Sequence, residues 1–405
     1  MRLLYLTPTA AMGGAERVLL DLLSMMRTAR PDWTVGLISA NDGPLAADAR
    51  RLGVETWVMP FPRDFARLGD ASLGTPAAWA KFARHAVGGS FATLRYLQDL
   101  RRTVSRFQPD VIHSNGIKMH LLGSLARPAG SRLIWHFHDY PSLRPVTNRL
   151  IKSLKTRCDA VVAVSESVAT DVREQVGPSV FVQTIWNSVD LDRFTPQGAT
   201  LDLDALAGLE PAPPGTVRVG LVATFARWKG HLLFLDMMRA LSTRTPVRGY
   251  IVGGPLYETH ASQVSLEELR AAVAARRLTG TVGLTGFVHD SAAALRSLDI
   301  VVHASTSAEP FGLVIAEAMA TGRAVVISDK GGVAELVKPG ATGLTYSSGN
   351  VEQLTAAVTQ LVDDAELRGA LGRAAHPAAI EQFHPSRLTA QMLDLYARVD
   401  RARAA

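Results

Sequence analysis

Two carboxylates separated by seven residues mark the second half of the chain. Glu309 lies just before a predicted helix over residues 312–322, and Glu317 lies within it. Because the first N–H groups of a helix have no partner inside it, those of Gly312 and Leu313 are predicted to bind a diphosphate. One of the two carboxylates would then accept hydrogen bonds from a sugar and the other from a ribose. A purely structural role, with Glu309 at the helix start and Glu317 in solvent, explains the spacing equally well.

A second loop suited to an anion follows the first predicted strand. Gly13 and Gly14 precede a helix that runs to about Met26. Two glycines at a helix start let backbone N–H groups approach a phosphate closely. The spacing is neither that of the dinucleotide-binding glycine fingerprint nor that of a P-loop. A plain tight turn explains this pair at least as well.

Both loops follow short runs of Val, Ile and Leu that alternate with longer amphipathic segments. Seven such runs lie near residues 3–6, 35–39, 54–58, 111–114, 133–136, 160–164 and 180–185. Six more lie near residues 217–223, 249–252, 282–284, 300–303, 324–327 and 343–346. A turn-rich connection with a proline cluster at 211–215 separates the two series, and an amphipathic helix is predicted from residue 384 to the end.

This alternation predicts an α/β chain with two Rossmann-like domains, each a doubly wound parallel sheet. Such sheets bind ligands outside the carboxyl ends of their strands. The chemistry is therefore expected in the loops after strands, at a cleft between the two domains.

The composition restricts the class of protein. With 405 residues, 47% hydrophobic and 20% charged, the chain is neither disordered nor membrane-embedded. The single cysteine, Cys158, excludes an internal disulfide and is expected to be a small buried hydrophobe. No apolar run reaches the roughly 18 residues that span a bilayer, and the apolar start is interpreted as a buried strand, not a signal peptide.

Positive charge is concentrated in the first half. Residues 1–190 hold 23 Lys and Arg against 16 Asp and Glu, whereas the rest holds 20 against 21. This excess favours an anionic partner for the first half, a membrane surface or a phosphorylated substrate ahead of nucleic acid. Chance on an arginine-rich surface explains it too.

The residues around the two glutamates resemble glycosyltransferase family 4, whose members are retaining nucleotide-sugar glycosyltransferases of the GT-B fold. The resemblance is carried by Glu309-Pro310-Phe311-Gly312-Leu313, Glu317-Ala318-Met319-Ala320, Gly331-Gly332-Val333-Ala334-Glu335-Leu336-Val337, Gly340-Ala341-Thr342-Gly343, Gly13-Gly14-Ala15-Glu16-Arg17 and Asn187-Ser188-Val189-Asp190. It implies an acceptor-binding domain over residues 1–190 and a nucleotide-sugar-binding domain over 191–384. A C-terminal helix over 385–405 would cross back to the first domain.

The resemblance assigns a cation to the site. Lys229, in Trp228-Lys229-Gly230, is similar to a family lysine that neutralises charge on the departing nucleoside diphosphate. The family usually has an arginine five residues earlier, where this chain has Thr224. Arg227 is close enough in sequence to substitute for it.

Histidines and an asparagine at strand ends are the candidates in the first domain. By its position in the resemblance, His138 is the expected active-site histidine near the transferring sugar, and His136 is expected to be structural. His113 and Asn115 end another strand and are the candidates for the acceptor side.

Loops after two strands of the second domain resemble those that surround the nucleotide. They contain Gly254, and Phe287 with Val288, whose backbone groups could bond a base edge. The Asp-x-Asp triplets at 190–192 and 202–204 are similar to the metal-binding motif of the other major glycosyltransferase fold, but both lie in the inter-domain connection. We therefore expect no metal ligand there, and the resemblance implies no metal and no cofactor.

Residues 77–107 interleave apolar and basic side chains. They are Phe82, Phe91, Leu94, Leu97, Leu100, Val104 and Phe107 with Lys81, Arg84, Arg95, Arg101, Arg102 and Arg106. Such a segment could lie on an anionic membrane and present a lipid-linked acceptor. An ordinary helix with its apolar stripe in the core explains the same pattern and is the preferred interpretation.

We therefore expect a metal-independent enzyme that transfers a sugar, with retention, from a UDP- or GDP-sugar to a saccharide or lipid-linked acceptor. Its setting would be cell-surface polysaccharide or glycolipid synthesis, in the cytoplasm, with the inner face of the cell membrane as an option. No nucleic-acid partner is expected. The alternatives are a sugar-nucleotide epimerase or a phosphorylase on the same fold, and a weakly active nucleotide-binding partner subunit.

Overall fold

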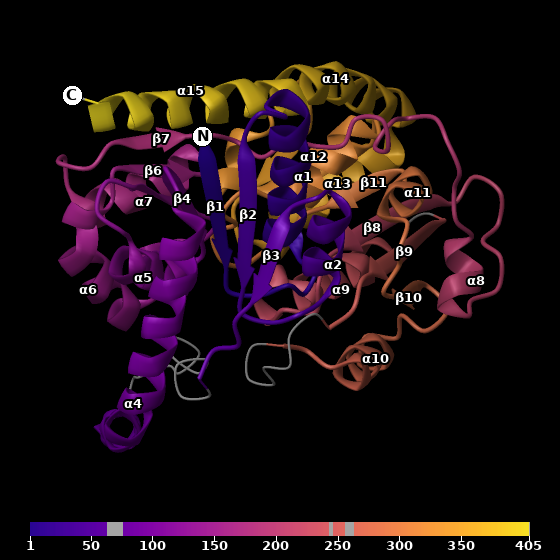
Figure 1. The fold of residues 1–405 in the computed structure, drawn as a ribbon. Helices are drawn as coiled ribbons and strands as arrows, with labels where there is room; N and C mark the ends of the chain where they lie inside the picture. Colours follow the sequence, from indigo (N-terminus) through magenta and orange to yellow (C-terminus); the bar gives the residue numbers. More distant parts are fainter. Residues whose placement is uncertain (63–75, 243–245, 256–262, 405) are drawn as a thin grey trace. The chain divides into compact units, whose positions relative to one another are not determined.

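The computed structural model describes residues 1–62, 76–242, 246–255 and 263–404 (Figure 1). Within these ranges the chain forms two parallel sheets, one of seven strands and one of six. All thirteen lie where short buried apolar runs predict them. The predicted α/β class, with two doubly wound sheets, is confirmed.

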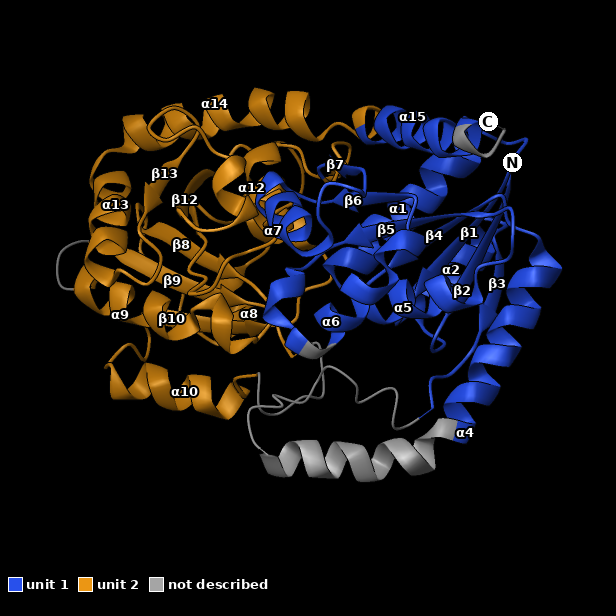
Figure 2. Ribbon diagram, turned by 90° about the vertical axis from the view of Figure 1, so that its left-hand side faces the viewer, with its two compact units in different colours: residues 1–186, 388–405 blue, residues 187–387 orange. Residues whose placement is uncertain are grey.

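The two sheets belong to two compact units, which are coloured in Figure 2. Unit 1 comprises Met1–Trp186 with Leu388–Ala405, and unit 2 comprises Asn187–Arg387. The turn that begins at Asn187 goes with unit 2 because Val189 donates its N–H to Phe383 and Arg387 bonds to the carbonyl of Asn187. The expected division, at residues 190 and 385, differs from this by a few residues.

The sheet of unit 1 has the strand order β3-β2-β1-β4-β5-β6-β7. Its strands are β1 (Arg2–Thr7), β2 (Thr34–Ser39), β3 (Glu55–Val58), β4 (Val111–Asn115), β5 (Arg132–Phe137), β6 (Ala160–Ala163) and β7 (Val182–Thr184). Its helices are α1 (Gly14–Ala29), α2 (Pro44–Arg51), α4 (Pro76–Phe107), α5 (Ile117–Ala126), α6 (Pro145–Leu154) and α7 (Glu166–Val176). The central strands are buried on both faces, as parallel strands between helical layers require.

The C-terminal helix α15 (Pro385–Ala404) completes the core of unit 1. One stripe of it packs on the same core cluster as β1 and α1, with side chains Leu388, Met392, Leu395, Tyr396 and Val399. Their spacing of three and four residues places them on one helix face. A helix more than 200 residues along the chain from β7 is therefore part of the first unit's core.

The sheet of unit 2 has the order β10-β9-β8-β11-β12-β13. Its strands are β8 (Val217–Val222), β9 (Val247–Val252), β10 (Val282–Gly286), β11 (Ile300–Val302), β12 (Ala324–Ser328) and β13 (Leu344–Tyr346). Its helices are α8 (Leu203–Ala207), α9 (His231–Leu241), α10 (Leu266–Ala275), α11 (Ser291–Arg296), α12 (Leu313–Ala320), α13 (Val351–Asp363) and α14 (Ala365–Phe383), with short 3₁₀ turns η3 (Arg227–Lys229) and η4 (Gly332–Glu335).

The connection between the two series of strands is anchored to unit 2. Asp202 caps the short helix α8, and the buried Asp204 accepts hydrogen bonds from Tyr250 and Arg248, each at 2.7 Å. Asp190 accepts a bond from the backbone N–H of Arg193. These capping and anchoring contacts give Asp190, Asp202 and Asp204 a structural use.

Candidate functional site

A buried carboxylate with three donors lies at the carboxyl end of β11. One oxygen of Glu309, Oε2, lies 2.6 Å from Nζ of Lys229 and 3.2 Å from Oγ of Ser305. Nε2 of His303 is 3.4 Å from the same oxygen. Strands β8 and β11 pair side by side, so the turn after β8 and the loop after β11 meet at one edge of the sheet. The structure thus brings Lys229 and Glu309 together.

The partners of Glu309 decide its charge. Burial alone would raise the pKa of this carboxyl group, but the Lys229 ammonium and the His303 ring outweigh burial and lower the pKa to about 2. Glu309 is therefore ionised at neutral pH and acts only as a hydrogen-bond acceptor. The ammonium of Lys229 also lies 4.1 Å from the ring centre of Trp228, in a cation–π contact.

Gly230 allows the close approach that places Lys229. It has a φ of +74°, and a Cβ atom there would lie 1.8 Å from the carbonyl oxygen of Ala304. Beside this contact, Thr306 donates its N–H to the carbonyl of Trp228 at 2.8 Å. The two loops are therefore held backbone to backbone, which a side chain at Gly230 would prevent.

The start of α12 lies in the same loop as Glu309. Gly312 precedes the helix with a φ of +89°, and a Cβ atom there would lie 2.6 Å from Cγ2 of Val333. Gly332 donates its N–H to the carbonyl of Glu309 at 2.7 Å, which fixes the loop from the other side. Glu317 is buried within α12, 7% exposed, and is not in solvent. Lys229 and a helix N-terminus thus form a positively polarised site beside a carboxylate.

The side chain of Arg227 forms an ion pair outside the Glu309 cluster. Its guanidinium lies 2.9 Å from Glu268 on α10, and both side chains are about half exposed. The partners of Glu309 described above do not include it. The structure therefore gives Arg227 a surface ion pair, and its proposed substitution for the arginine missing at Thr224 stays a prediction.

The predicted nucleotide loops touch each other at the ends of β9 and β10. Gly253 donates its N–H to the carbonyl of Gly286, and a Cβ atom on Gly254 would lie 3.3 Å from Cβ of Phe287. The ring of Phe287 is 65% exposed, and Val288 beside it is partly buried. An exposed aromatic ring at a strand end offers an apolar face to a flat ligand.

In unit 1, the glycine pair is only part of the start of α1. Gly13 is the N-cap residue, and Glu16 lies at the third helical position. Burial raises the pKa of the Glu16 carboxyl group, and hydrogen bonds from the backbone N–H groups of Glu16 and Gly13 oppose this. Glu16 thus supplies half of a capping box, which the Gly-Gly-x-Glu spacing could have indicated. Anion binding by Gly13 and Gly14 stays a prediction, because the chain's own carboxylate already bonds there.

Asn115 and His138, two of the predicted site residues, lie at the ends of β4 and β5. Nε2 of His138 lies 3.1 Å from Oδ1 of Asn115, so these two residues meet. Burial lowers the pKa of His138 to about 4, which keeps the imidazole neutral at pH 7. His136 is 1% exposed, beneath His138 with ring centres 4.1 Å apart.

His113 requires a correction. It is fully buried, with Nδ1 at 2.8 Å from the hydroxyl of Tyr396 and Nε2 at 3.1 Å from Nδ1 of His136. Both ring nitrogens are therefore occupied inside unit 1, and His113 cannot line an acceptor surface. Its place two residues before the end of β4 gave no sign that its side chain points into the core.

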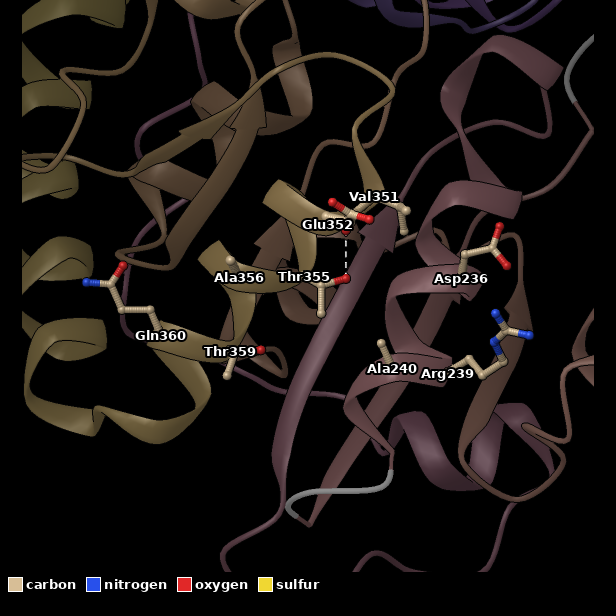
Figure 3. A pocket seen from close by; sticks show the side chains of 9 residues that line it. All are labelled: Asp236, Arg239, Ala240, Val351, Glu352, Thr355, Ala356, Thr359 and Gln360. Atoms are coloured by element: carbon tan, nitrogen blue, oxygen red, sulfur yellow. Dashed lines mark hydrogen bonds between the residues drawn. The ribbon is translucent and has the colours of Figure 1, made fainter.

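Sequence reasoning missed His303 and Ser305, although the apolar run before them marks them as strand-end residues. It also did not indicate a groove of about 870 Å³ between α9 and α13 (Figure 3). The groove is lined by Asp236, Arg239, Ala240, Val351, Glu352, Thr355, Ala356, Thr359 and Gln360. It lies along two helices and includes none of the strand-end residues described above.

Two family models match the chain. Residues 12–193 match the model described as Glycosyltransferase Family 4, and residues 216–364 match the one described as Glycosyl transferases group 1. The two matches fall on units 1 and 2 respectively, apart from the first residues of unit 2.

Two individual relatives of the chain are mannosyltransferases. The chain is 26% identical over 397 residues to a GDP-mannose-dependent alpha-(1-6)-phosphatidylinositol monomannoside mannosyltransferase of Mycolicibacterium smegmatis, covering 91% of this chain and 100% of the relative. It is 33% identical over 240 residues to the lipopolysaccharide core biosynthesis mannosyltransferase LpsB of Rhizobium meliloti, covering 57% of this chain and 64% of that protein. The chain spans 53%, 59% and 64% of the length of three of its curated relatives.

A solved structure shares the architecture. Anabaena HepE, crystallised with UDP and glucose, superposes with a TM-score of 0.80 at 23% identity, covering 98% of this chain and 99% of HepE. This likeness confirms the expected GT-B fold.

Proposed function

Since the chain belongs to glycosyltransferase family 4, we propose that it transfers a sugar from a nucleoside-diphosphate sugar to a saccharide or lipid-linked hydroxyl group, with retention and without a metal ion. The observation that carries this proposal is the Lys229–Glu309 pair, joined at 2.6 Å beside the start of α12. A cation and free helix N–H groups suit a diphosphate, and a permanently ionised carboxylate suits sugar hydroxyls.

Each residue then has one task. Lys229 and the first N–H groups of α12 bind the diphosphate, and Glu317 bonds the ribose. Glu309 accepts hydrogen bonds from the donor sugar. From unit 1, His138 contacts the sugar as a neutral imidazole. Because Lys229 is already held by Glu309 and Trp228, its charge is in place before bond breaking begins, as electrostatic catalysis requires.

Retention follows if the acceptor attacks from the face that the diphosphate leaves. The acceptor oxygen bonds to the anomeric carbon while the bond from that carbon to the phosphate oxygen breaks, and the acceptor proton passes to the departing phosphate. The electron pair of the broken bond stays on the diphosphate, whose new charge Lys229 stabilises. Glu309 is a poor nucleophile for a two-step route, because Lys229, Ser305 and His303 already engage its Oε2.

The donor is proposed as a UDP- or GDP-sugar. HepE was crystallised with UDP, whereas the mycobacterial relative is GDP-mannose-dependent, so both nucleotides stay in the proposal. Thermal unfolding with UDP, GDP and their sugar conjugates separates them, because a ligand that binds only the folded protein raises its melting temperature. A shift with one nucleotide alone identifies the donor class.

We also propose that unit 1 contacts anionic membrane from the cytoplasmic side. On α4, Phe91 and Leu94 are 76% and 58% exposed beside Arg95. On and before α6, Leu143 and Leu150 are 66% and 42% exposed. The side chains of residues 76–90 lie outside the described residues, and the later α4 residues Leu100, Val104 and Phe107 are buried in the core, as the ordinary-helix interpretation predicts. Of the helices described, none is long and apolar enough to cross a bilayer.

Lys229→Met and Glu309→Gln test the transferase proposal. Each should lower kcat for nucleoside diphosphate release by about 100-fold or more, because one loses the cation and the other the ionised acceptor. Release should require an acceptor, which separates transfer from epimerisation, and the product's anomeric coupling in proton NMR should show retention. Arg227→Met tests whether Arg227 replaces the missing arginine: loss of its exposed ion pair alone should change kcat/KM by less than about threefold, so a larger fall would place Arg227 at the donor.

Lys338→Met and Glu352→Gln are the matched controls, because both side chains are exposed and lie outside the Glu309 cluster. They should keep the wild-type rate. Full turnover by both Lys229→Met and Glu309→Gln would show that the site is assigned wrongly.

A further inference from the structure

A line of buried polar side chains crosses the core of unit 1. The hydroxyl of Tyr5 lies 2.9 Å from that of Tyr396, and the Tyr396 hydroxyl lies 2.8 Å from Nδ1 of His113. Nε2 of His113 then lies 3.1 Å from Nδ1 of His136. We call these four residues the polar string; each is at most 1% exposed. Three come from strands β1, β4 and β5, and Tyr396 comes from α15.

Strand register places the string on one face of the sheet. Tyr5 is the direct neighbour of His113, and His136 is the direct neighbour of Asn115, two residues beyond His113. Because side chains alternate along a strand, these residues share the face that α15 covers. The string therefore runs diagonally toward the strand ends, where the ring of His138 lies against that of His136.

Burying such a string of polar side chains brings little gain in free energy unless its hydrogen bonds fix the orientation of a functional group. Polar groups buried in a dry core add little net stability, and apolar side chains of similar size would pack there as well. What hydrogen bonds between buried polar groups do add is a fixed orientation. The residue at the end of this line is His138, whose other contact is Asn115 at 3.1 Å.

The hydrogen bonds also have a preferred direction. Burial lowers the pKa of His113 to about 3 and that of His136 well below its usual value, so both imidazoles are neutral and carry one proton each. In one direction, Tyr5 donates to Tyr396, and Tyr396 in turn donates to Nδ1 of His113. His113 then donates from Nε2 to Nδ1 of His136. One group then lacks a partner among the described residues, the Nε2–H of His136.

The reverse direction leaves two groups unpaired. His136 would donate from Nδ1 to His113, which would donate to Tyr396, and Tyr396 to Tyr5. The Tyr5 proton and the bare Nε2 of His136 would then both lack partners within the described part of the chain. An unpaired buried polar group costs roughly 1–3 kcal/mol, so the first direction is preferred. His136 therefore carries its proton on Nε2.

We infer that Tyr396 is a positioning residue: from the C-terminal helix it fixes the orientation and tautomer of His113 and His136, and through the His136 ring the orientation of His138. The inference rests on the proposed function in one respect, because it affects turnover only if His138 acts in the transfer. The hydroxyl group is the part of Tyr396 that matters, since the ring can pack without it.

Tyr396→Phe removes that hydroxyl and keeps the ring. We expect a folded protein whose kcat falls about tenfold while KM for the donor stays within about twofold, the size of effect seen when a supporting hydrogen bond to an active group is lost. Long-range ¹H–¹⁵N spectra of histidine-labelled protein should show His136 protonated on Nε2 in the wild type. In the variant, the ring nitrogens of His113 and His136 should shift toward a mixture of tautomers.

Leu395→Met is the matched control, because Leu395 is equally buried on the same helix and carries no polar atom. It should lower the melting temperature without moving the histidine signals. Unchanged histidine signals in Tyr396→Phe, or an unchanged kcat in an active enzyme, would overturn the inference. If the wild type transfers no sugar, the proposed function fails, and the spectra still decide whether Tyr396 sets the tautomers.

Discussion

Gly312 shows how a single residue can hold the site together. Its φ of +89° is unfavourable for any residue with a Cβ atom, and that atom would lie 2.6 Å from Cγ2 of Val333. Gly312→Ala should therefore lower the free energy of unfolding by about 2–4 kcal/mol, the sum of the left-handed strain and the overpacking. Urea unfolding followed by fluorescence measures it.

Gly340→Ala separates the two causes. Gly340 also has a positive φ, +74°, but a Cβ atom there would meet no described atom within 4 Å. The cost should then be the backbone strain alone, about 1–2 kcal/mol. Equal losses for the two variants would contradict the contact with Val333.

Single residues also show what a sequence can indicate about a site. Glu309 and Gly312 were predicted because they lie in one short motif after a strand, where neighbours in sequence are neighbours in space, and Lys229 was predicted from its resemblance to the family lysine. The polar string could not be predicted, since His113 and Tyr396 are 283 residues apart and nothing local to either shows the other. His303 is an intermediate case. The sequence indicates its position at a strand end, but only the structure shows its bond to Glu309.

Elements were more predictable than contacts. Thirteen buried strands were indicated by apolar runs, because parallel strands covered on both faces contain few polar residues. The short helix α8 was not predicted, since its segment is proline-rich and is held by the distant partners of Asp204. The membership of α15 in the core of unit 1 was implied by family resemblance, and its apolar stripe alone could not say which sheet it covers.

The helices α4 and α6 carry the membrane prediction. Both pack against α5 in unit 1 and expose three large apolar side chains, Phe91, Leu94 and Leu150, and the turn before α6 exposes a fourth, Leu143. Flotation with liposomes containing anionic lipid should recover the protein, and neutral liposomes should recover much less, because basic residues add about 1 kcal/mol each near a charged surface. The Phe91→Ser, Leu94→Ser double variant should reduce recovery several-fold.

Matched variants test whether liposome recovery needs these residues or any exposed apolar residue. Leu206→Ser and Leu232→Ser remove side chains of unit 2 that are 48% and 46% exposed. Their recovery should equal that of the wild type. Recovery that does not depend on lipid charge would rule out the proposed surface.

At the scale of the whole molecule, the two units differ in how they hold ionisable groups. Unit 1 buries His113, His120 and His136 and half-buries His138, and desolvation lowers the pKa of each. Unit 2 has Glu309, whose pKa is lowered to about 2 once Lys229 and His303 outweigh burial. The positive excess of the first half thus coexists with an interior that excludes charge, so the excess is a property of its surface.

This difference predicts that acid unfolds unit 1 first. A histidine with a lowered pKa binds protons more weakly when folded than when unfolded, so its contribution is complete above the unfolded value of about 6.5 and is lost as the pH falls toward 4. Each unit of pKa difference contributes about 1.4 kcal/mol, and four histidines act in the same direction. Glu16, whose pKa is raised, opposes them, but it is one group against four.

Glu309 behaves differently, since its lowered pKa contributes stability that persists until the pH falls below about 4.5 and is lost only toward 2.

The free energy of unfolding of unit 1 in urea should therefore fall steadily between pH 7 and pH 5. That of unit 2, with His231 as its own buried histidine of lowered pKa, should change less. Five of the six tryptophans, Trp33, Trp57, Trp79, Trp135 and Trp186, belong to unit 1, and Trp228 belongs to unit 2. Replacing Trp228 with Phe therefore makes fluorescence report on unit 1. His120→Asn, away from the polar string and bonded to Ser114, should reduce the pH dependence without altering transfer. A free energy of unfolding for unit 1 that stays constant from pH 7 to pH 5 would contradict the neutral, buried histidines on which both the proposed role of His138 and the polar string depend.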